Sequence, residues 1–153
     1  MSRQRLLILL AAGGSAALIL GAWGFQYIGG MAPCKLCYWQ RYGHYLAIVL
    51  GGLALWRPYP PVLMLGALGA FSSAVIGAYH SGVERKWWEG PTTCTSGSIE
   101  GLSADDLMKQ IMEAPLVRCD EIPWEMFGVS MANLNVLASL AVALLWVAAL
   151  RRA

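Results

Sequence analysis

The chain has 153 residues, of which 58% are hydrophobic and only 13% are charged, and its formal net charge is +2. A mean hydropathy of +0.54 excludes an ordinary soluble domain, and we expect a lipid bilayer, and no nucleic acid, as its partner. A length of 153 residues is typical of one domain, so residues 1–153 are treated as a single unit.

Four apolar segments are expected to span a bilayer, at about residues 6–28, 40–56, 61–79 and 129–150. About 20 helical residues cross the hydrocarbon layer of ~30 Å. The second segment is the shortest and needs Tyr38–Arg41 at the interface. Four such runs leave no polar sequence to cover them in water. The sequence therefore predicts an all-α membrane protein, a bundle of four transmembrane helices with a long external loop.

The first segment starts like a secretory signal peptide, because Arg3 and Arg5 precede the run LLILLAAGG. The apolar stretch continues through Trp23 and Phe25, which is longer than the apolar core of a typical signal peptide. No small-x-small cleavage site ends it. We expect a retained first helix.

Charge placement predicts the orientation. All carboxylates lie between Glu84 and Glu125, in one long polar segment. With four spans, both termini and the turn at 57–60 share the other side, where basic residues flank short segments. Short basic flanks belong in the cytoplasm. Both termini are therefore expected inside a bacterial inner membrane, with the external loops 29–41 and 80–128 facing the periplasm.

All four cysteines fall in these two external loops, where thiols become disulfides: Cys34, Cys37, Cys94 and Cys119. Four cysteines allow three pairings, and the short spacing favours Cys34–Cys37, which leaves Cys94–Cys119. A Cys34–Cys37 ring is so small that it constrains the unfolded chain little, which favours redox exchange over stability as its purpose. Spacing alone favours a structural staple over a catalytic role for Cys94–Cys119. A zinc site is the alternative for Cys34 and Cys37, but no second close pair or histidine cluster accompanies them, so we expect no metal.

Arg41 follows the Cys34–Cys37 pair closely. If the second helix begins near the pair, then Cys37, Arg41 and His44 share one helix face. The cation and the helix N-terminus would both favour a thiolate at Cys37. An arginine at the end of a span also commonly reaches to the interface, and this alternative stays open. His44 is expected to pack at the interface.

The residue pattern of the external loop predicts one short helix. Gly, Pro and Thr residues around Cys94 predict a flexible segment. Ser103 then has the position of an N-cap for an amphipathic helix that Pro115 ends, with Leu107, Ile111 and Ala114 on one face. We expect this helix to lie on the membrane surface and to keep the loop close to the first cysteine pair.

Several motifs together resemble the disulfide bond formation protein B (DsbB) family. They are Pro33-Cys34-x-Leu36-Cys37-Tyr38-x-Gln40-Arg41, Tyr79-His80, the Cys94 and Cys119 pair, and Trp124-x-x-Phe127-Gly128-x-Ser130-Met131. The resemblance implies an inner-membrane enzyme that reoxidises a periplasmic thioredoxin-like (DsbA-like) thiol oxidase. It also implies that the electrons pass to ubiquinone or menaquinone.

The resemblance also implies a role for each site residue. Cys94 would be attacked by the partner, and Cys119 would exchange with Cys34. Cys37 would face the quinone as a thiolate, with Arg41 stabilising that charge and holding the quinone. His80, at the end of the third span, would assist the quinone site.

Two other readings remain open. One is a non-enzymatic four-helix membrane protein whose disulfides are structural. The other is a vitamin K epoxide reductase-like enzyme, in which the CxxC motif follows the loop pair, whereas here Cys34 and Cys37 come first.

Overall fold

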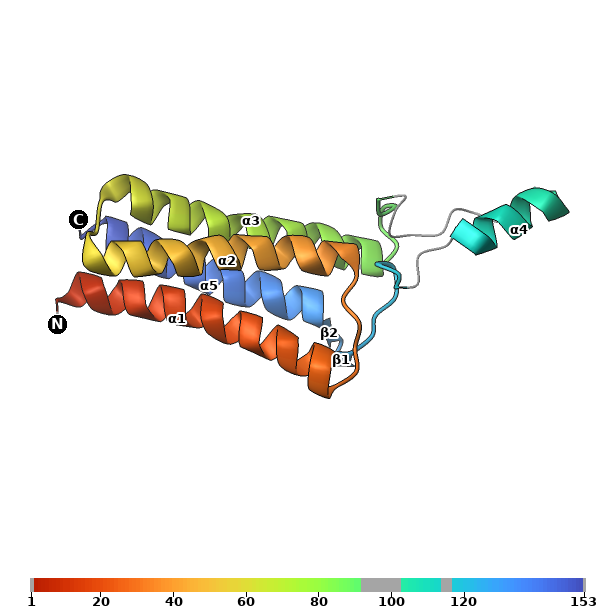
Figure 1. Ribbon diagram of the computed structural model, residues 1–153, viewed down its shortest axis with the longest axis horizontal. Coiled ribbons are helices and arrows are strands. Elements are labelled where there is room, and N and C mark those ends of the chain that lie inside the picture. Colours follow the sequence, from red (N-terminus) through yellow and green to blue (C-terminus); the bar gives the residue numbers. More distant parts are fainter. Residues whose placement is uncertain (1, 92–102, 114–116, 153) are drawn as a thin grey trace.

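Four long helices form one bundle in the computed structural model, which describes residues 2–91, 103–113 and 117–152 (Figure 1). They are α1 (Arg3–Trp23), α2 (Lys35–Trp56), α3 (Pro60–Glu84) and α5 (Met131–Leu150). A π-helical turn, η1 (Gly24–Ile28), continues α1. The short helix α4 (Ala104–Glu113) belongs to the chain between α3 and α5. A two-stranded hairpin, β1 (Glu125–Met126) and β2 (Val129–Ser130), leads into α5.

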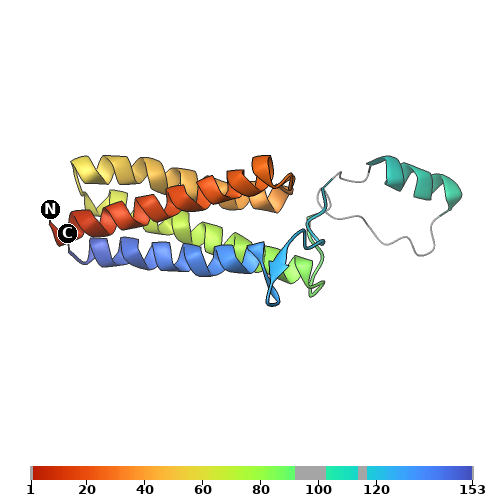
Figure 2. The ribbon, with the colours of Figure 1, turned by 90° about the horizontal axis from the view of Figure 1, so that it is seen from below.

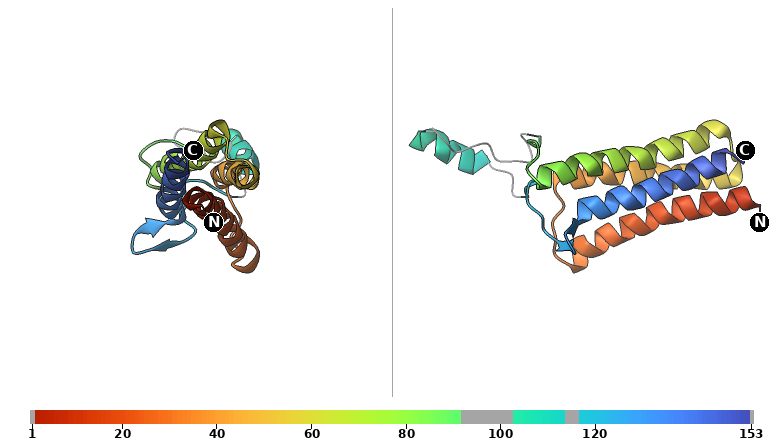
Figure 3. Two further views of the ribbon diagram at one scale, coloured as in Figure 1. Left: turned by 90° about the vertical axis from the view of Figure 1, so that its left-hand side faces the viewer. Right: turned by 180° about the vertical axis from the view of Figure 1, so that it is seen from behind.

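The helices form a ring in which each packs against two others. The contacts run from α1 to α2, from α2 to α3, from α3 to α5, and from α5 back to α1. Both termini and the α2–α3 turn lie at one end of the bundle, and the η1–α2 connection, the end of α3 and the hairpin lie at the other (Figures 1 and 3). The two segments predicted to be external therefore share one end of the bundle.

Three of the four bundle helices are long and apolar enough to cross a membrane. They are α1 together with η1 (Arg3–Ile28), α3 and α5. The first half of α2 carries Lys35, Gln40, Arg41 and His44, which lower its hydropathy. The structure thus confirms a mostly helical protein with three candidate spans, and the fourth predicted span, within α2, stays a prediction.

Near the cysteines, α2 and α3 extend beyond the predicted membrane spans 40–56 and 61–79. α2 begins at Lys35, where Cys34 is the N-cap and its Sγ accepts a hydrogen bond from the Cys37 backbone N–H. α3 continues five residues past Tyr79, to Glu84. Hydropathy ends the predicted spans at the first polar residues, but Gln40, Arg41 and His80 are buried and hydrogen-bonded within the longer helices. The hairpin and the π-helical turn were not predicted.

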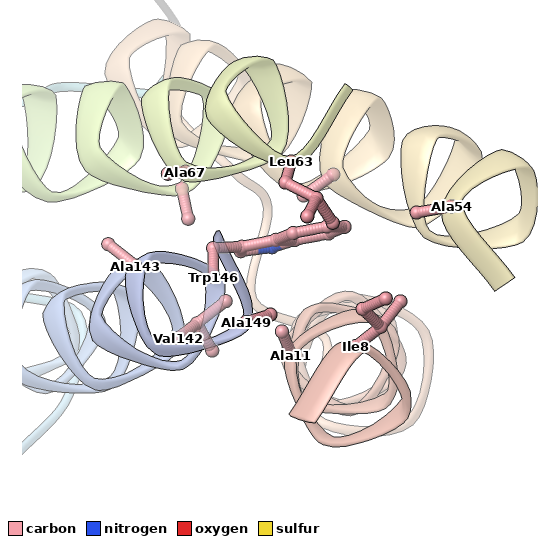
Figure 4. Close-up of a cluster of buried hydrophobic side chains, with 11 residues drawn as sticks. Ile8, Ala11, Ala54, Leu63, Ala67, Val142, Ala143, Trp146 and Ala149 are labelled. Carbon is pink, nitrogen blue, oxygen red and sulfur yellow. The ribbon is translucent and has the colours of Figure 1, made fainter. Parts of the chain in front are cut away.

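The half of the bundle near the termini has an apolar core around Trp146, which is fully buried (Figure 4). Its neighbours come from every helix of the bundle and include Ile8, Leu63 and Val142. Gly66 makes room for the indole, because a Cβ at this position would lie 2.8 Å from the Trp146 ring.

The short helix α4 has the predicted cap. The Ser103 hydroxyl accepts a hydrogen bond of 3.2 Å from the Asp106 backbone N–H and donates one of 2.6 Å to the Asp106 carboxylate. Figure 2 shows α4 beyond the end of the bundle that carries η1. Cys94, Ala114, Pro115 and the side chain of Ile111, which also belong to this prediction, lie outside the described residues.

The helices α2 and α3 approach each other closely at Gly43 and Gly69. A Cβ at Gly43 would overlap the carbonyl oxygen of Gly69, whereas a Cβ at Gly52, on the same helix, meets nothing within 4 Å. We expect Gly43→Ala to lower the free energy of unfolding by about 1–3 kcal/mol, because the two backbones must separate. Gly52→Ala is the matched control and should be neutral or slightly stabilising, since alanine is the better helix former. Thermal unfolding in one detergent, followed by circular dichroism, measures both. Equal midpoints for the two variants would contradict the close packing.

Candidate functional site

The predicted pair Cys34 and Cys37 lies at the start of α2, where the structure holds it as two free thiols. Cys34 is 5% exposed, and its Sγ lies 3.0 Å from that of Cys37. The hydrogen bond to Cys37, together with burial, raises the pKa of the Cys34 thiol. Cys34 therefore keeps its proton and shares it with the Cys37 sulfur, so negative charge is expected on Cys37.

His80 reaches the pair from α3. Its Nε2 lies 3.6 Å from the Cys34 Sγ, and its Nδ1 lies 3.0 Å from the side-chain nitrogen of Gln40. One turn further along α3, a carboxylate oxygen of Glu84 lies 3.9 Å from the His80 Nε2, and the other oxygen accepts a hydrogen bond from Ser130. No role in the site was predicted for Glu84 or for Ser130. The i, i+4 spacing of His80 and Glu84 would have indicated the first, had α3 been predicted to continue.

Cys34, Cys37 and His80 also satisfy the geometry of a metal site, because their ligand atoms lie within 4.8 Å of one another. The expectation of no metal rested on the lack of a second close cysteine pair or a histidine cluster beside Cys34 and Cys37 in the sequence. Helix packing brings His80 to them from the far end of α3. The absence of a metal therefore stays a prediction.

Arg41 lies one helical turn after Cys37 and is 8% exposed. Its guanidinium donates a hydrogen bond of 2.6 Å to the Gln26 side-chain oxygen in η1 and one of 3.4 Å to the Ala22 carbonyl oxygen. Within the described part of the chain, no carboxylate lies at salt-bridge distance from Arg41. An arginine that merely reaches to the interface would be exposed, so burial favours the functional reading.

Cys119 is the described member of the second pair. It is disulfide-bonded and fully buried, and it packs in one cluster with Cys34 and Val83. Its backbone also hydrogen-bonds the His80 ring. Beside it, Arg118 binds Asp120 through two hydrogen bonds of 3.0 and 2.6 Å, which hold the pKa of that carboxyl below its usual range. The predicted role of Cys94 falls outside the described residues.

His44 does not pack at the interface, and that prediction is wrong. Its ring is 2% exposed and lies inside the bundle, with Nδ1 3.2 Å from the Ser15 hydroxyl and Nε2 3.0 Å from the Ser139 hydroxyl. The shared face of Cys37, Arg41 and His44 was the signal in the sequence, because Cys37 and Arg41 already marked that face as the one turned to the site.

A cavity of about 630 Å³ joins these groups. It lies between α1, α2, α5 and the chain at 117–124. Its polar lining includes Cys34, Cys37, Arg41, His44, His80 and Asn135, and its apolar lining includes Leu18, Ile19, Phe25, Trp124, Leu134 and Ala138. Such a site suits a mostly apolar molecule with a few polar atoms.

Comparisons with known proteins agree with the geometry. Residues 4–149 match the family model described as disulfide bond formation protein DsbB. The chain is 29% identical to disulfide bond formation protein B of Shewanella sp. (strain MR-4), over 85% of this chain and 77% of that protein. It is 31% identical to disulfide bond formation protein B 2 of Pseudomonas aeruginosa, over 70% of this chain and 67% of that protein. No solved structure matches. Since the family model covers nearly the whole chain, the protein belongs to the DsbB family of disulfide bond formation proteins.

Proposed function

We propose that this protein is a membrane disulfide oxidoreductase that reoxidises a DsbA-like periplasmic thiol oxidase and passes the electrons to ubiquinone or menaquinone. The observation that carries the proposal is the position of the Cys34–Cys37 dithiol at the wall of a largely apolar cavity inside the helix bundle. A dithiol that exchanged only with soluble partners would need no such cavity. Family membership supports the same activity.

In this proposal α2 is the fourth span. It packs along α1 and α3, and a turn of three residues, Arg57–Tyr59, joins it to α3 at the end of the bundle that holds the termini. We expect a helix that packs along two membrane helices in this way to cross the same layer. Both termini would then be cytoplasmic, and the cysteines would face the periplasm.

The cavity fits a quinone. Its volume lies in the range of ordinary ligand sites, its walls are mostly apolar, and Arg41, His44 and Asn135 offer hydrogen-bond partners for polar ring oxygens. Arg41 would hold one such oxygen, and a bound quinone would supply a two-electron acceptor from within the bilayer. Arg41 is a buried cation without a carboxylate partner among the described residues, so it is suited to stabilise negative charge that arises during the reaction.

Cys119 and Cys34 lie in one buried cluster, which offers the two pairs a route of exchange. After a partner dithiol reduces the Cys94–Cys119 disulfide, the Cys119 thiolate attacks Cys34, the Cys34–Cys37 bond breaks, and Cys37 leaves as a thiolate. Cys94 then attacks Cys119, which restores the loop disulfide and releases Cys34. The result is a disulfide-bonded Cys119 beside two free thiols, which is the state that the structure holds.

The chain's own groups favour Cys37 as the leaving sulfur. It lies in the first turn of α2, where the helix dipole favours an anion, and the charge of Arg41 acts on it. Cys34 adds a hydrogen bond at 3.0 Å. A structural staple would need none of these groups, so the arrangement disfavours the non-enzymatic reading. The family match disfavours the vitamin K epoxide reductase-like one.

Replacement of a loop cysteine by serine separates the two pairs. With Cys119→Ser, the lone Cys94 thiolate can attack and break the disulfide of an oxidised thioredoxin-like partner, and no Cys119 is present to release that partner, so a mixed disulfide of partner and protein should accumulate on non-reducing gels. With Cys94→Ser it should not. Both variants should lose quinone reduction by the partner, followed by ultraviolet absorbance, and should still bind a short-chain ubiquinone analogue. Failure of both variants to accumulate in the membrane would favour structural disulfides instead.

Replacement of Arg41 by glutamine tests the cation. In a Cys34→Ser background, where Cys37 is a lone thiol, Arg41→Gln should raise the pKa of the Cys37 thiol, since the positive charge beside the thiolate is lost. Alkylation rates across pH measure this pKa, and calorimetry measures affinity for the quinone analogue, which should fall about tenfold or more. Lysine should rescue only in part, because it lacks the planar fork of the guanidinium. Arg57→Gln, at the other end of α2, is the matched control. Unchanged pKa and affinity in Arg41→Gln would remove Arg41 from the site.

A further inference from the structure

An unbroken line of side-chain hydrogen bonds joins the middle of the bundle to the cysteine pair. It passes through all four bundle helices, from Ser15 through His44, Ser139, Asn135, Gln40 and His80 to Cys34. We propose that every donor in this line points toward the cysteines. Gln40 and Asn135 are then positioning residues that hold His80 in the tautomer whose Nε2–H donates to Cys34. This inference rests on the proposed function for its role in exchange.

The orientation of the Gln40 amide follows from a backbone carbonyl. The Gln40 side-chain nitrogen lies 3.2 Å from the Leu36 carbonyl oxygen, which can only accept a hydrogen bond. The group at this position must therefore be the NH₂ of the amide. Its second hydrogen points to the His80 Nδ1, at 3.0 Å. Nδ1 is then an acceptor, and the proton of a neutral His80 ring resides on Nε2.

The orientation of Asn135 is determined in the same way. Its side-chain nitrogen lies 3.4 Å from the Ser73 carbonyl oxygen and 2.7 Å from the Gln40 side-chain oxygen, so it donates to both acceptors. Its oxygen then faces the Ser139 hydroxyl, at 3.2 Å. The Asn135 side chain also hydrogen-bonds the His44 ring, and the Ser139 hydroxyl also lies 3.4 Å from the Ser73 hydroxyl. We assign the Ser139 hydrogen to the nearer Asn135 oxygen, because an amide oxygen can only accept.

The inner end of the line continues in the same direction. A hydroxyl has one hydrogen, so Ser139 accepts from the His44 Nε2 at 3.0 Å. The Nδ1 of a neutral His44 ring is then unprotonated, and Ser15 donates to it at 3.2 Å. All these side chains except the half-buried Asn135 are at most 6% exposed. Burial therefore limits competition by water for the bonds outside Asn135, and each bond polarises the next.

The outer end reaches the reacting sulfurs. The Nε2–H of His80 faces the Cys34 Sγ at 3.6 Å, within the range of hydrogen bonds to sulfur, and Cys34 lies 3.0 Å from Cys37. Glu84 approaches the same nitrogen at 3.9 Å. A carboxylate is an acceptor, so it too favours a proton on Nε2. The Cys119 backbone also hydrogen-bonds the His80 ring, and the Gln40 donor faces Nδ1.

This tautomer determines what His80 does in the exchange. When Cys94 attacks Cys119 of a Cys34–Cys119 disulfide, the bond to Cys34 breaks and Cys34 leaves with the electron pair. The Nε2–H stabilises the charge on this sulfur. The proton that the Cys94 thiol has lost is balanced by the one that Cys34 takes up. With its lone pair on Nδ1 turned to Gln40, His80 serves as a donor to Cys34 and not as its base.

The chain contains only two histidines, so nitrogen NMR reads both tautomers directly. In the full-length protein labelled with ¹⁵N-histidine in detergent, with neither quinone nor partner added, Nδ1 of both rings should resonate as an unprotonated nitrogen and Nε2 as a protonated one. A His80→Asn variant assigns the signals. A protonated Nδ1 on His80 in the unaltered protein overturns the proposal.

Gln40→Glu replaces the donor that faces the His80 Nδ1 with a carboxyl group of nearly the same shape. Imidazole is more basic than a carboxyl group, so the proton shared by Glu and Nδ1 should move onto Nδ1. The release of Cys34, followed by acid quench and gel analysis of the cysteine pairs after mixing with a reduced partner, should slow by about tenfold, the effect of one hydrogen bond to a charged group. Ser72→Ala is the matched control, because Ser72 donates only within α3, to Gly69. It should change neither signal nor rate.

Two outcomes for Gln40→Glu count against the proposal. An unprotonated Nδ1 would show that Gln40 does not set the tautomer. A protonated Nδ1 together with an unprotonated Nε2, at an unchanged rate of Cys34 release, would show that the tautomer has no part in exchange. The NMR measurement uses neither quinone nor partner, so it fails or succeeds independently of the proposed function.

Discussion

The structure depends on one constraint: a polar side chain inside an apolar bundle must be hydrogen-bonded, because an unpaired one costs ~1–3 kcal/mol or more. The bundle meets this constraint in its outer half by placing a polar residue from each helix on one connected line. Every bond on that line crosses between helices, apart from the one between Asn135 and Ser139 on α5. The same bonds that satisfy the polar groups therefore fix the rotation and register of all four helices.

The two halves of the bundle have different chemistry. Near the termini the interior is apolar, with Trp146 packed against residues such as Ile8 and Leu63. Near the cysteines it is polar and contains the cavity. The described hydrogen-bond line ends at Ser15, before the apolar half begins. In the proposed function, the protons and electrons of the reaction would thus be exchanged at the periplasmic end alone.

Close helix packing and the site depend on each other. Gly43 lets α2 approach α3 at Gly69. Along α2, Gly43 lies one turn from Gln40, whose side chain meets His80. A larger residue would separate the helices and lengthen the bond that orients His80. Packing in the bundle thus controls the donor that faces Cys34.

The sequence by itself determined the helical class, three candidate spans and the family, because apolar length and the spacing of Cys34, Cys37 and Arg41 are local properties. It also determined the cap at Ser103. The predicted spans 40–56 and 61–79 cover only the apolar parts of α2 and α3, because hydropathy treats buried and exposed polar residues alike.

Only the tertiary structure decided which polar residues meet. His80 joins Cys34 from 46 positions away, and His44 joins Ser139 from 95. Such partners depend on the rotation of each helix about its axis, which no single helix specifies. The rotation that pairs the polar groups from Ser15 to Cys34 exists only when four helices pack together, and this is why this line could not be predicted from the sequence.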